Sequence, residues 1–366
     1  MKKKITFILQ PKVQHYRLHI FDKLIIKLEK SHKILVFGIT DNGEAINGGK
    51  RDYILNLKYK ALFGLEWWSG LINKLLKYKP SIVVQTASPR NFSCWFLLSF
   101  SKFFGIKLIG WSKINSDRDN ESFLKKHIKR FFYSRYADLI LYGDKSLQEI
   151  EKLKITNVKT YLAYNTIDTD FVKNKKEFLD IHKKKIISKF KLDKINFIYL
   201  CIGRMIDEKR QGDIIDAWKI SSIDKNVSRL IFVGSGPNYK NLKNKNSYLD
   251  KSIIFVGRVP TGIDYVWLCI SHFSVFGGAL GLGCQQSFLM RSLVIAPYEN
   301  NVDSEFLINK QNSILFEKGN IFELSKIIEI VCKNNNNDIL DNAFNYVTNH
   351  RHNDKLVGEV VRAITS

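Results

Sequence analysis

Residues 197–218 read FIYLCIGRMIDEKRQGDIIDAW and combine an apolar strand pattern, a polar turn and a helical pattern. The run Phe197–Cys201 predicts a buried strand, and Asp213–Trp218 predicts a helix. Between them, Arg204 follows the strand and Lys209 comes five residues later. Two cations beside the free N–H groups of a helix start favour an anion site, because Arg offers a fork for phosphate oxygens and Lys a mobile charge. The alternative is a pair of solvated surface cations.

Glycine-rich turns follow the next strand patterns in the same half. The strand 230–233 runs into Gly234 and Gly236, without the third glycine of a dinucleotide fingerprint, so alone it indicates a tight turn. The run 253–259 has a similar turn, and 276–283 reads FGGALGLG ahead of another helical pattern. Glycines there would let a phosphate and a sugar approach the backbone. The alternative is a flexible loop without a partner.

Strand and helix patterns alternate on both sides of this stretch, which is typical of parallel sheets with crossover helices. The sequence therefore predicts an α/β protein of two Rossmann-like, doubly wound domains that share an interdomain cleft. We expect an N-terminal domain at 1–167, a second domain at 168–345 after a polar hinge within 168–194, and a last helix at 346–366 that crosses back. The predicted strands are 5–9, 33–38, 82–85, 107–110, 139–142, 159–163, 197–201, 229–233, 252–256, 273–276 and 293–296. The predicted helices include 19–29, 65–78, 92–104, 122–136, 145–153 and 339–364.

Taken in order, the motifs of the second half resemble those of retaining glycosyltransferase family 4, the glycosyl transferases group 1 of the GT-B fold, of the polysaccharide, O-antigen or capsule type. The resemblance is specific over about 195–320 and weaker at Asn165–Asp168. The matching residues are Gly203, Arg204, Lys209, Ala217, Gly234, Gly236, Pro237, Phe255, Gly257, Val259, Gly281, Leu282, Val294, Ile295, Ala296, Glu305 and Asn312.

The resemblance implies that a nucleotide-diphosphate-sugar donor binds this half. It assigns Arg204 and Lys209 as catalytic residues that hold the donor diphosphate, the Phe255–Val259 turn to the base, and the Gly277–Leu282 loop to the sugar and phosphate. No metal or other cofactor is expected. The implied donor-binding residues are Gly203, Gly234, Gly257, Val259, Gly277, Gly278, Gly281, Leu282 and Gln286.

Two positions depart from the family pattern. The family usually carries two glutamates eight positions apart, for the donor sugar and the ribose, where this chain has Gly278 and Gln286. The amide of Gln286 can still bind ribose hydroxyls, whereas Gly278 cannot replace a carboxylate. Either main-chain groups bind the sugar, or catalysis is impaired. Arg291 and Leu293 also replace a usual glycine and proline.

The N-terminal half offers acceptor candidates at the ends of its predicted strands, where open α/β sheets bind ligands. They are His15, Tyr16, Arg17, Arg90 and Lys113. A lone His or Arg at such a place is more often structural or solvated, so these are weak candidates. We expect the acceptor to be a glycan or a lipid-linked molecule.

Charge is unevenly distributed along the chain. The formal net charge is +23, and residues 1–170 alone carry a net charge of +15. This favours attraction to an anionic membrane or to nucleic acid, unless the lysines only solvate the surface. Helical patterns at 65–78 and 125–135 interleave aromatics with cations, which is typical of a bilayer interface but more often of a core-facing stripe. No specific nucleic-acid motif is present.

No signal peptide or spanning segment is apparent, so a cytoplasmic location is expected, with peripheral binding to the inner face of the cytoplasmic membrane. The five cysteines are predicted to be reduced.

The resulting expectation is a glycosyltransferase that retains anomeric configuration and acts in bacterial surface polysaccharide synthesis. Two alternatives remain open. One is a nucleotide-sugar-binding homologue with impaired catalysis, and the other is a nonspecific polyanion-binding protein.

Overall fold

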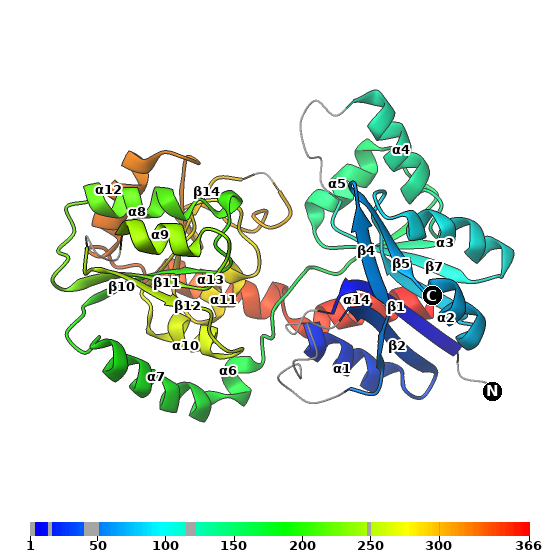
Figure 1. Ribbon diagram of the computed structural model, residues 1–366, viewed down its shortest axis with the longest axis horizontal. Helices are drawn as coiled ribbons and strands as arrows, with labels where there is room; N and C mark the ends of the chain where they lie inside the picture. Colours follow the sequence, from blue (N-terminus) through cyan, green and yellow to red (C-terminus); the bar gives the residue numbers. More distant parts are fainter. Residues whose placement is uncertain (1–3, 14–16, 40–50, 115–121, 247–249, 300) are drawn as a thin grey trace. The chain divides into compact units, whose positions relative to one another are not determined.

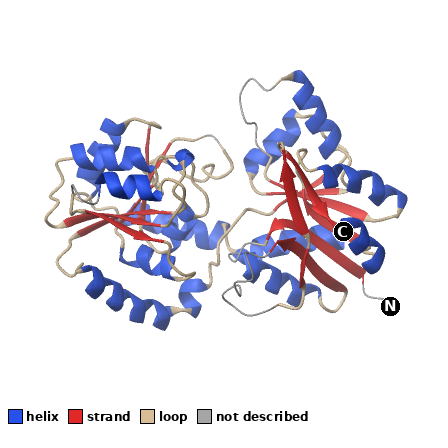
Figure 2. Cartoon of the chain, in the orientation of Figure 1, coloured by secondary structure: helices blue, strands red, loops and turns tan. Residues whose placement is uncertain are grey.

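The computed structural model describes residues 4–13, 17–39, 51–114, 122–246, 250–299 and 301–366. Contacts divide the chain into two compact units (Figure 1). Unit 1 comprises residues 1–165 and 353–366, and unit 2 comprises residues 166–352. Each unit has a parallel sheet with helices on both faces, as Figure 2 shows. The predicted α/β fold with two Rossmann-like domains is thereby confirmed.

Unit 1 is built on a seven-stranded sheet of order β3-β2-β1-β6-β7-β8-β9. The strands are β1 (Lys4–Lys12), β2 (His32–Ile39), β3 (Ile54–Asn56), β6 (Ile82–Thr86), β7 (Lys107–Ser112), β8 (Asp138–Leu141) and β9 (Lys159–Leu162). The helices are α1 (Leu18–Leu28), α2 (Leu71–Tyr78), α3 (Phe92–Phe103), α4 (Phe123–Tyr133), α5 (Asp144–Lys152) and α14 (Asn353–Thr365). The last of these packs on α1, on β8 and on the edge strand β9.

A β-hairpin of unit 1 corrects a sequence prediction. The expected helix 65–78 is wrong over its first half, where β4 (Lys58–Leu62) and β5 (Leu65–Ser69) pair antiparallel. Tyr59 faces Trp68 across the hairpin with ring centroids 6.5 Å apart, the kind of cross-strand aromatic pair that stabilises a sheet. Gly70, at φ 82°, then turns the chain into α2.

Unit 2 is built on a six-stranded sheet of order β12-β11-β10-β13-β14-β15. The strands are β10 (Phe197–Ile202), β11 (Ser228–Val233), β12 (Ile253–Gly257), β13 (Phe273–Val275), β14 (Leu293–Pro297) and β15 (Ile314–Phe316). The helices are α6 (Phe171–Asn174), α7 (Lys176–Phe190), α8 (Gln211–Ile220), α9 (Tyr239–Asn246), α10 (Ile263–Ile270), α11 (Gly283–Leu289), α12 (Ile321–Val331) and α13 (Asn337–His350), with a short 3-10 turn, η2, at Asp207–Lys209. Helices α8 and α12 pack together on one face of the sheet, and α7 and α10 pack together on the other (Figure 1).

The C-terminal helix prediction is also corrected. The expected continuous helix 339–364 is two helices, α13 and α14, with Arg351 and His352 between them. Arg351 is almost fully buried, and its guanidinium donates to Glu305 at 3.0 Å, which requires a backbone direction that a continuous helix does not provide. Its main-chain oxygen also accepts a short hydrogen bond from Thr166.

The cores of both units come from the apolar strand patterns recognised in the sequence. Leu200, Ile231 and Val294 of unit 2 are fully buried, as are Phe7, Val83 and Ile109 of unit 1. All five cysteines are free thiols, and burial raises the pKa of Cys201 to about 12. Within the described ranges, no helix is long and apolar enough to cross a membrane.

Candidate active site

The strand order of unit 2 determines where a ligand can bind. Strand β10 pairs with β11 on one side and with β13 on the other, so the chain reverses its direction of winding between β10 and β13. Open parallel sheets bind ligands outside the carboxyl ends of the strands at such a switch point. The loops that flank it here are 203–210, which follows β10, and 276–282, which follows β13. Both were singled out from the sequence.

Backbone hydrogen bonds join neighbouring loops into one continuous edge. The Gly203 N–H donates to the Val233 carbonyl at 2.9 Å, and the Gly234 N–H donates to the Gly257 carbonyl at 2.9 Å. Across the switch point, the Ala279 N–H donates to the Glu208 carbonyl at 2.7 Å. The loops after β10, β11, β12 and β13 therefore hold one another in place.

This loop packing requires glycine at three predicted donor-binding positions and at the motif residue Gly236. A Cβ at Gly234 would lie 1.9 Å from the Gly203 carbonyl oxygen, and one at Gly236 would lie 2.2 Å from that of Met205. A Cβ at Gly277 would meet the Arg210 carbonyl oxygen at 2.5 Å, and one at Gly278 would meet that of Glu208 at 2.2 Å. These glycines allow one backbone segment to approach another.

Gly203 and Gly281 lie in a different environment. Gly203 has φ 133° and nothing within 4 Å of a Cβ position. Gly281 has φ 115°, and the nearest group to its Cβ position is the Lys209 amine at 3.8 Å. Positive φ favours glycine at both positions. A Cβ would meet no neighbour at Gly203 and only the end of the Lys209 side chain at Gly281.

Lys209 is half-buried at the switch point. Its ammonium donates a short hydrogen bond to the Leu280 carbonyl and so connects the loop after β10 with the loop after β13. Burial lowers the pKa of Lys209 below its ordinary value, while Cys284, Cys201 and the acidic groups Asp303 and Glu299 partly offset that effect. An anion that entered here would restore the charge that burial disfavours.

Arg204 has the opposite character, since its side chain is exposed. Its carbonyl accepts a hydrogen bond of 3.0 Å from the Gln211 side chain, which ties the turn to the first residue of α8. Among the described residues, its guanidinium has no hydrogen bond or ion pair. Because the backbone at Arg204 is fixed and its guanidinium has no hydrogen bond within the described residues, the side chain is suited to binding an anionic ligand.

Gln286 is held by an acidic residue that the sequence analysis missed. Its amide donates to Asp264 at 3.0 Å, and the other oxygen of Asp264 accepts from the Gly262 N–H at 2.8 Å. Asp264 therefore connects α11 to the turn before α10. Val259 and Leu282 are half-buried against the same core.

Gly257, at φ 86°, ends β12, and its Cβ position lies 3.4 Å from the Tyr239 hydroxyl. With Gly203, Gly234, Gly277, Gly278, Gly281 and Leu282, it lies in or beside the loops at the carboxyl ends of β10 to β13. The fold brings the predicted donor residues to this edge of the sheet.

Two useful residues gave only faint sequence signals. Asp264 stands two positions after Gly262, a spacing typical of a side chain that binds backbone N–H groups at a helix start. Glu208 acts through its carbonyl, and a main-chain contact of that kind leaves no residue-type signal.

In unit 1, the switch point lies between β1 and β6, because β1 pairs with β2 on one side and β6 on the other. Arg17 follows β1 and Arg90 follows β6, so these two acceptor candidates flank it. Arg17 is buried, with its guanidinium 5.6 Å from the Trp111 ring centroid and 5.1 Å from that of Tyr142. Arg90 and Lys113 are exposed. His15 and Tyr16 lie outside the described residues.

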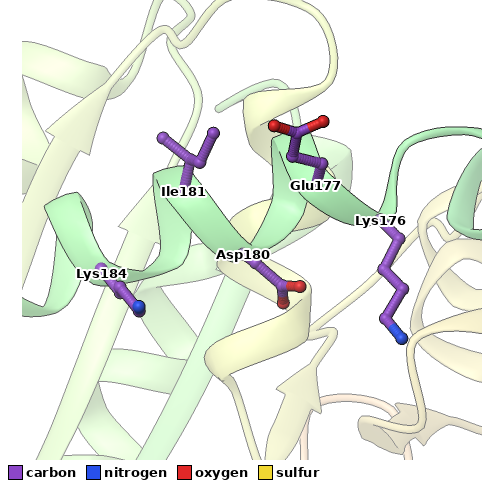
Figure 3. Close-up of a pocket in the computed structure, with 5 residues that line it drawn as sticks. All are labelled: Lys176, Glu177, Asp180, Ile181 and Lys184. Carbon is purple, nitrogen blue, oxygen red and sulfur yellow. The ribbon is translucent and has the colours of Figure 1, made fainter.

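A shallow cavity of about 410 Å³ lies along α7 (Figure 3). It is lined by Lys176, Glu177, Asp180, Ile181 and Lys184. Two lysines and two acids leave this surface without net charge, and none of the predicted donor residues lines it. It is therefore not the anion site.

Residues 182–348 match the family model described as glycosyl transferases group 1. No curated protein sequence matches the chain. The structure is similar to that of Anabaena HepE in complex with UDP, with a TM-score of 0.75 and 14% identity over 99% of each chain. It is also similar to a Rickettsia africae glycosyltransferase, with a TM-score of 0.74 and 16% identity over 99% of this chain and 98% of that one. The lipopolysaccharide outer core galactosyltransferase WaaB gives a TM-score of 0.64 and 13% identity over 99% of each chain.

At these identities the structural likeness defines the fold, which is the GT-B fold of two Rossmann-like units. The sequence match adds the family of the segment that contains the switch point of unit 2, its glycine loops and its two cations. The match of residues 182–348 to the glycosyl transferases group 1 model supports a glycosyltransferase.

Proposed function

We propose that the chain transfers a sugar from a nucleotide-diphosphate-sugar, with retention of anomeric configuration, to a glycan or lipid-linked acceptor in bacterial surface polysaccharide synthesis. The observation that carries the proposal is the pair of cations, Arg204 and Lys209, in the loop at the switch point of unit 2, where Gly203 has no neighbour within 4 Å of its Cβ position and Gly281 lies next to the Lys209 amine. Solved relatives with the same fold add support, since HepE has been solved with UDP and with UDP-glucose. UDP-sugars are accordingly the first donors to test.

In the proposed mechanism, the donor diphosphate is the leaving group and its negative charge grows in the transition state. Arg204 binds phosphate oxygens with its planar guanidinium, and Lys209 adds a second positive charge that the Leu280 carbonyl orients. Preorganised donors of this kind typically contribute on the order of 3 kcal/mol per contact to catalysis. The first turn of α8 adds its free N–H groups.

The proposed acceptor binds at the carboxyl edge of the unit 1 sheet, where Arg90 and Lys113 are exposed. Arg17 positions that edge by packing on Trp111 and Tyr142. A lipid-linked acceptor would keep the enzyme at the inner face of the cytoplasmic membrane. WaaB, named as a lipopolysaccharide galactosyltransferase, supports an acceptor of the surface-polysaccharide class.

Transfer is proposed to need no metal, because cationic side chains take the place of a divalent ion at the diphosphate. Treatment of the protein with EDTA should then leave the rate of transfer unchanged. A rate that falls with EDTA and returns with Mg²⁺ or Mn²⁺ would disprove this part of the mechanism.

The test of the function begins with a thermal-shift screen across nucleoside diphosphates and their sugar conjugates, since a ligand of the native state raises the melting temperature. The conjugate with the largest shift is then incubated with lipid-linked and glycan acceptors, and the anomeric configuration of the product is read by NMR. Transfer with retention supports the proposal. Binding without transfer or hydrolysis would identify a catalytically impaired homologue, an outcome that the absence of a carboxylate at Gly278 makes worth measuring.

A further inference from the structure

Helix α3 carries a stripe of phenylalanine rings, of which Phe92, Phe96 and Phe103 are exposed and Phe100 is half-buried. Phe92, Phe96, Phe100 and Phe103 follow at spacings of four, four and three residues, which places them on one helical stripe. The Phe96 and Phe100 ring centroids lie 5.1 Å apart, and those of Phe100 and Phe104 lie 4.2 Å apart. Phe103 is 84% exposed. Monomeric soluble proteins rarely expose contiguous apolar patches of large size, so the stripe indicates a binding surface.

Helix α4 exposes a second apolar face and opposes it with cations. At 100° per residue, Phe123, Leu124, Ile128 and Phe131 lie on one half of the helix, and Lys125, Lys126, Lys129 and Arg130 lie on the other. Phe123 is 78% exposed, and the helix buries only Phe132 and Tyr133 near its C-terminal end. In Figure 1, α4 stands at the top of unit 1. Because α4 packs on its own core only through its last turn, its exposed apolar face is available to a binding partner.

Contacts within unit 1 join these faces into one surface. Trp95 of α3 stacks on Phe131 of α4 at 6.1 Å between ring centroids. In the same first turn of α3, the Ser93 hydroxyl accepts a hydrogen bond of 2.9 Å from the Trp68 N–H of the hairpin, which fixes the hairpin beside the helix start. Phe63 at the hairpin tip is 96% exposed. We call the exposed apolar residues of these three elements the aromatic surface. It consists of Leu62, Phe63, Leu65, Phe92, Phe96, Phe103, Phe104, Phe123, Leu124, Ile128 and Phe131.

The charge around the aromatic surface selects the partner. Residues 67–114 and 122–137 contain twelve lysines and arginines and no aspartate or glutamate. Aromatic side chains flanked by cations suit a bilayer interface, where rings enter the headgroup region and cations meet anionic lipids. A surface for a second copy of the chain would instead bring these cations against one another.

We propose that the aromatic surface binds the interface of an anionic lipid bilayer. Membrane binding requires neither donor nor acceptor, so it can be tested without sugar transfer. Its role in presenting a lipid-linked acceptor to unit 1 rests on the proposed function. Arg90 stands two residues before the first ring of the α3 stripe, so the bound membrane would lie next to the carboxyl edge of unit 1, where a lipid-linked acceptor has to arrive.

The test uses the full chain and vesicles of phosphatidylcholine with or without phosphatidylglycerol, read by co-sedimentation. The first variant is Phe63→Ser/Phe103→Ser/Phe123→Ser, at three of the most exposed rings, and the second is Lys125→Glu/Lys126→Glu. Phe322→Ser is the matched control, because Phe322 is also 78% exposed but belongs to α12 of unit 2. Unchanged melting temperatures establish that each variant folds.

Wild-type protein should bind vesicles that contain phosphatidylglycerol, and less so at high salt. Each of the two variants should need about tenfold more lipid for half-maximal binding, whereas Phe322→Ser should bind like wild type. Equal binding by the triple variant and wild type would overturn the proposal, as would an absence of binding to anionic vesicles. A wild-type dimer that the triple variant abolishes, measured by sedimentation velocity, would assign the surface to a second copy instead.

Discussion

The carbonyl oxygen of Glu208 lies 2.2 Å from the point where a Cβ at Gly278 would stand. The adjacent Ala279 N–H donates to the same oxygen at 2.7 Å, so the loops after β10 and β13 run in direct backbone contact. A side chain with a carboxylate therefore has no space at position 278 while the two loops keep this contact.

Introducing a glutamate at this position should harm the protein. Gly278→Glu or Gly278→Ala must displace the loop that holds Lys209, because a real Cβ contact of 2.2 Å does not occur. Overpacking of this kind typically costs about 1–3 kcal/mol, or roughly 2–4 °C of melting temperature per kcal/mol for a unit of this size. Gly212→Ala on α8 is the control, since nothing lies within 4 Å of its Cβ position. A Gly278→Glu protein with wild-type stability and higher turnover would contradict this account.

Arg204→Ala should lower kcat by about a hundredfold while leaving the melting temperature unchanged. The side chain is exposed, and the bond that fixes its backbone comes from Gln211, so the substitution removes charge without removing structure. Steady-state kinetics with the donor identified by thermal shift measure the effect. Lys333→Ala, at another exposed cation of unit 2, should leave kcat as it is.

Lys209 should give the enzyme an alkaline limit. Burial lowers its pKa below 10.5, so the charged form that the diphosphate requires is lost at a lower pH than for a solvated lysine. As the pH rises through the pKa of Lys209 in the free enzyme, kcat/KM should fall. Bound diphosphate raises that pKa, so the alkaline fall of kcat should occur at higher pH. Lys209→Arg keeps the charge at all these pH values and should abolish the alkaline fall. An identical fall in Lys209→Arg would assign it to another group.

The buried pair of Glu305 and Arg351 should stabilise unit 2 strongly. Its atoms lie 3.0 Å apart, with side chains only 5% and 2% exposed. Glu305→Leu removes the carboxylate that the buried Arg351 guanidinium binds and should cost about 3–5 kcal/mol, which the double variant Glu305→Leu/Arg351→Met partly recovers. The exposed pair of Arg291 and Asp341 is the comparison, and Asp341→Asn should change stability by less than about 1 kcal/mol. Urea unfolding measures all four proteins.

Much of the fold could be predicted because its strands are buried on both faces and therefore appear as continuous apolar runs, such as Phe197–Cys201. The hairpin could not, because Leu65, Trp68 and Leu71 repeat at helical spacing, and the segment is a strand through its antiparallel pairing with β4. At the break between α13 and α14, Arg351 pairs with Glu305, which lies 46 residues away in sequence, and such a distant contact leaves no local pattern.

The candidate site was recognisable for a similar reason. Positions such as Arg204 and Lys209 have a fixed place relative to a strand end, and the strand order brings those ends together. The role of the glycines was harder to assign. Gly278 and Gly281 look alike in sequence, but Gly278 faces the Glu208 carbonyl oxygen and Gly281 faces the Lys209 amine. Asp264 was missed since its partner Gln286 is on a different helix.

The central claim is that the cations at the switch point of unit 2 hold the diphosphate of the donor. Calorimetric titration of wild type and Arg204→Ala with the preferred nucleoside diphosphate and the matching monophosphate tests it directly. Wild type should bind the diphosphate at least about tenfold more tightly than the monophosphate, and Arg204→Ala should lose that preference while binding the monophosphate as before. An undiminished preference for the diphosphate in Arg204→Ala would contradict the account.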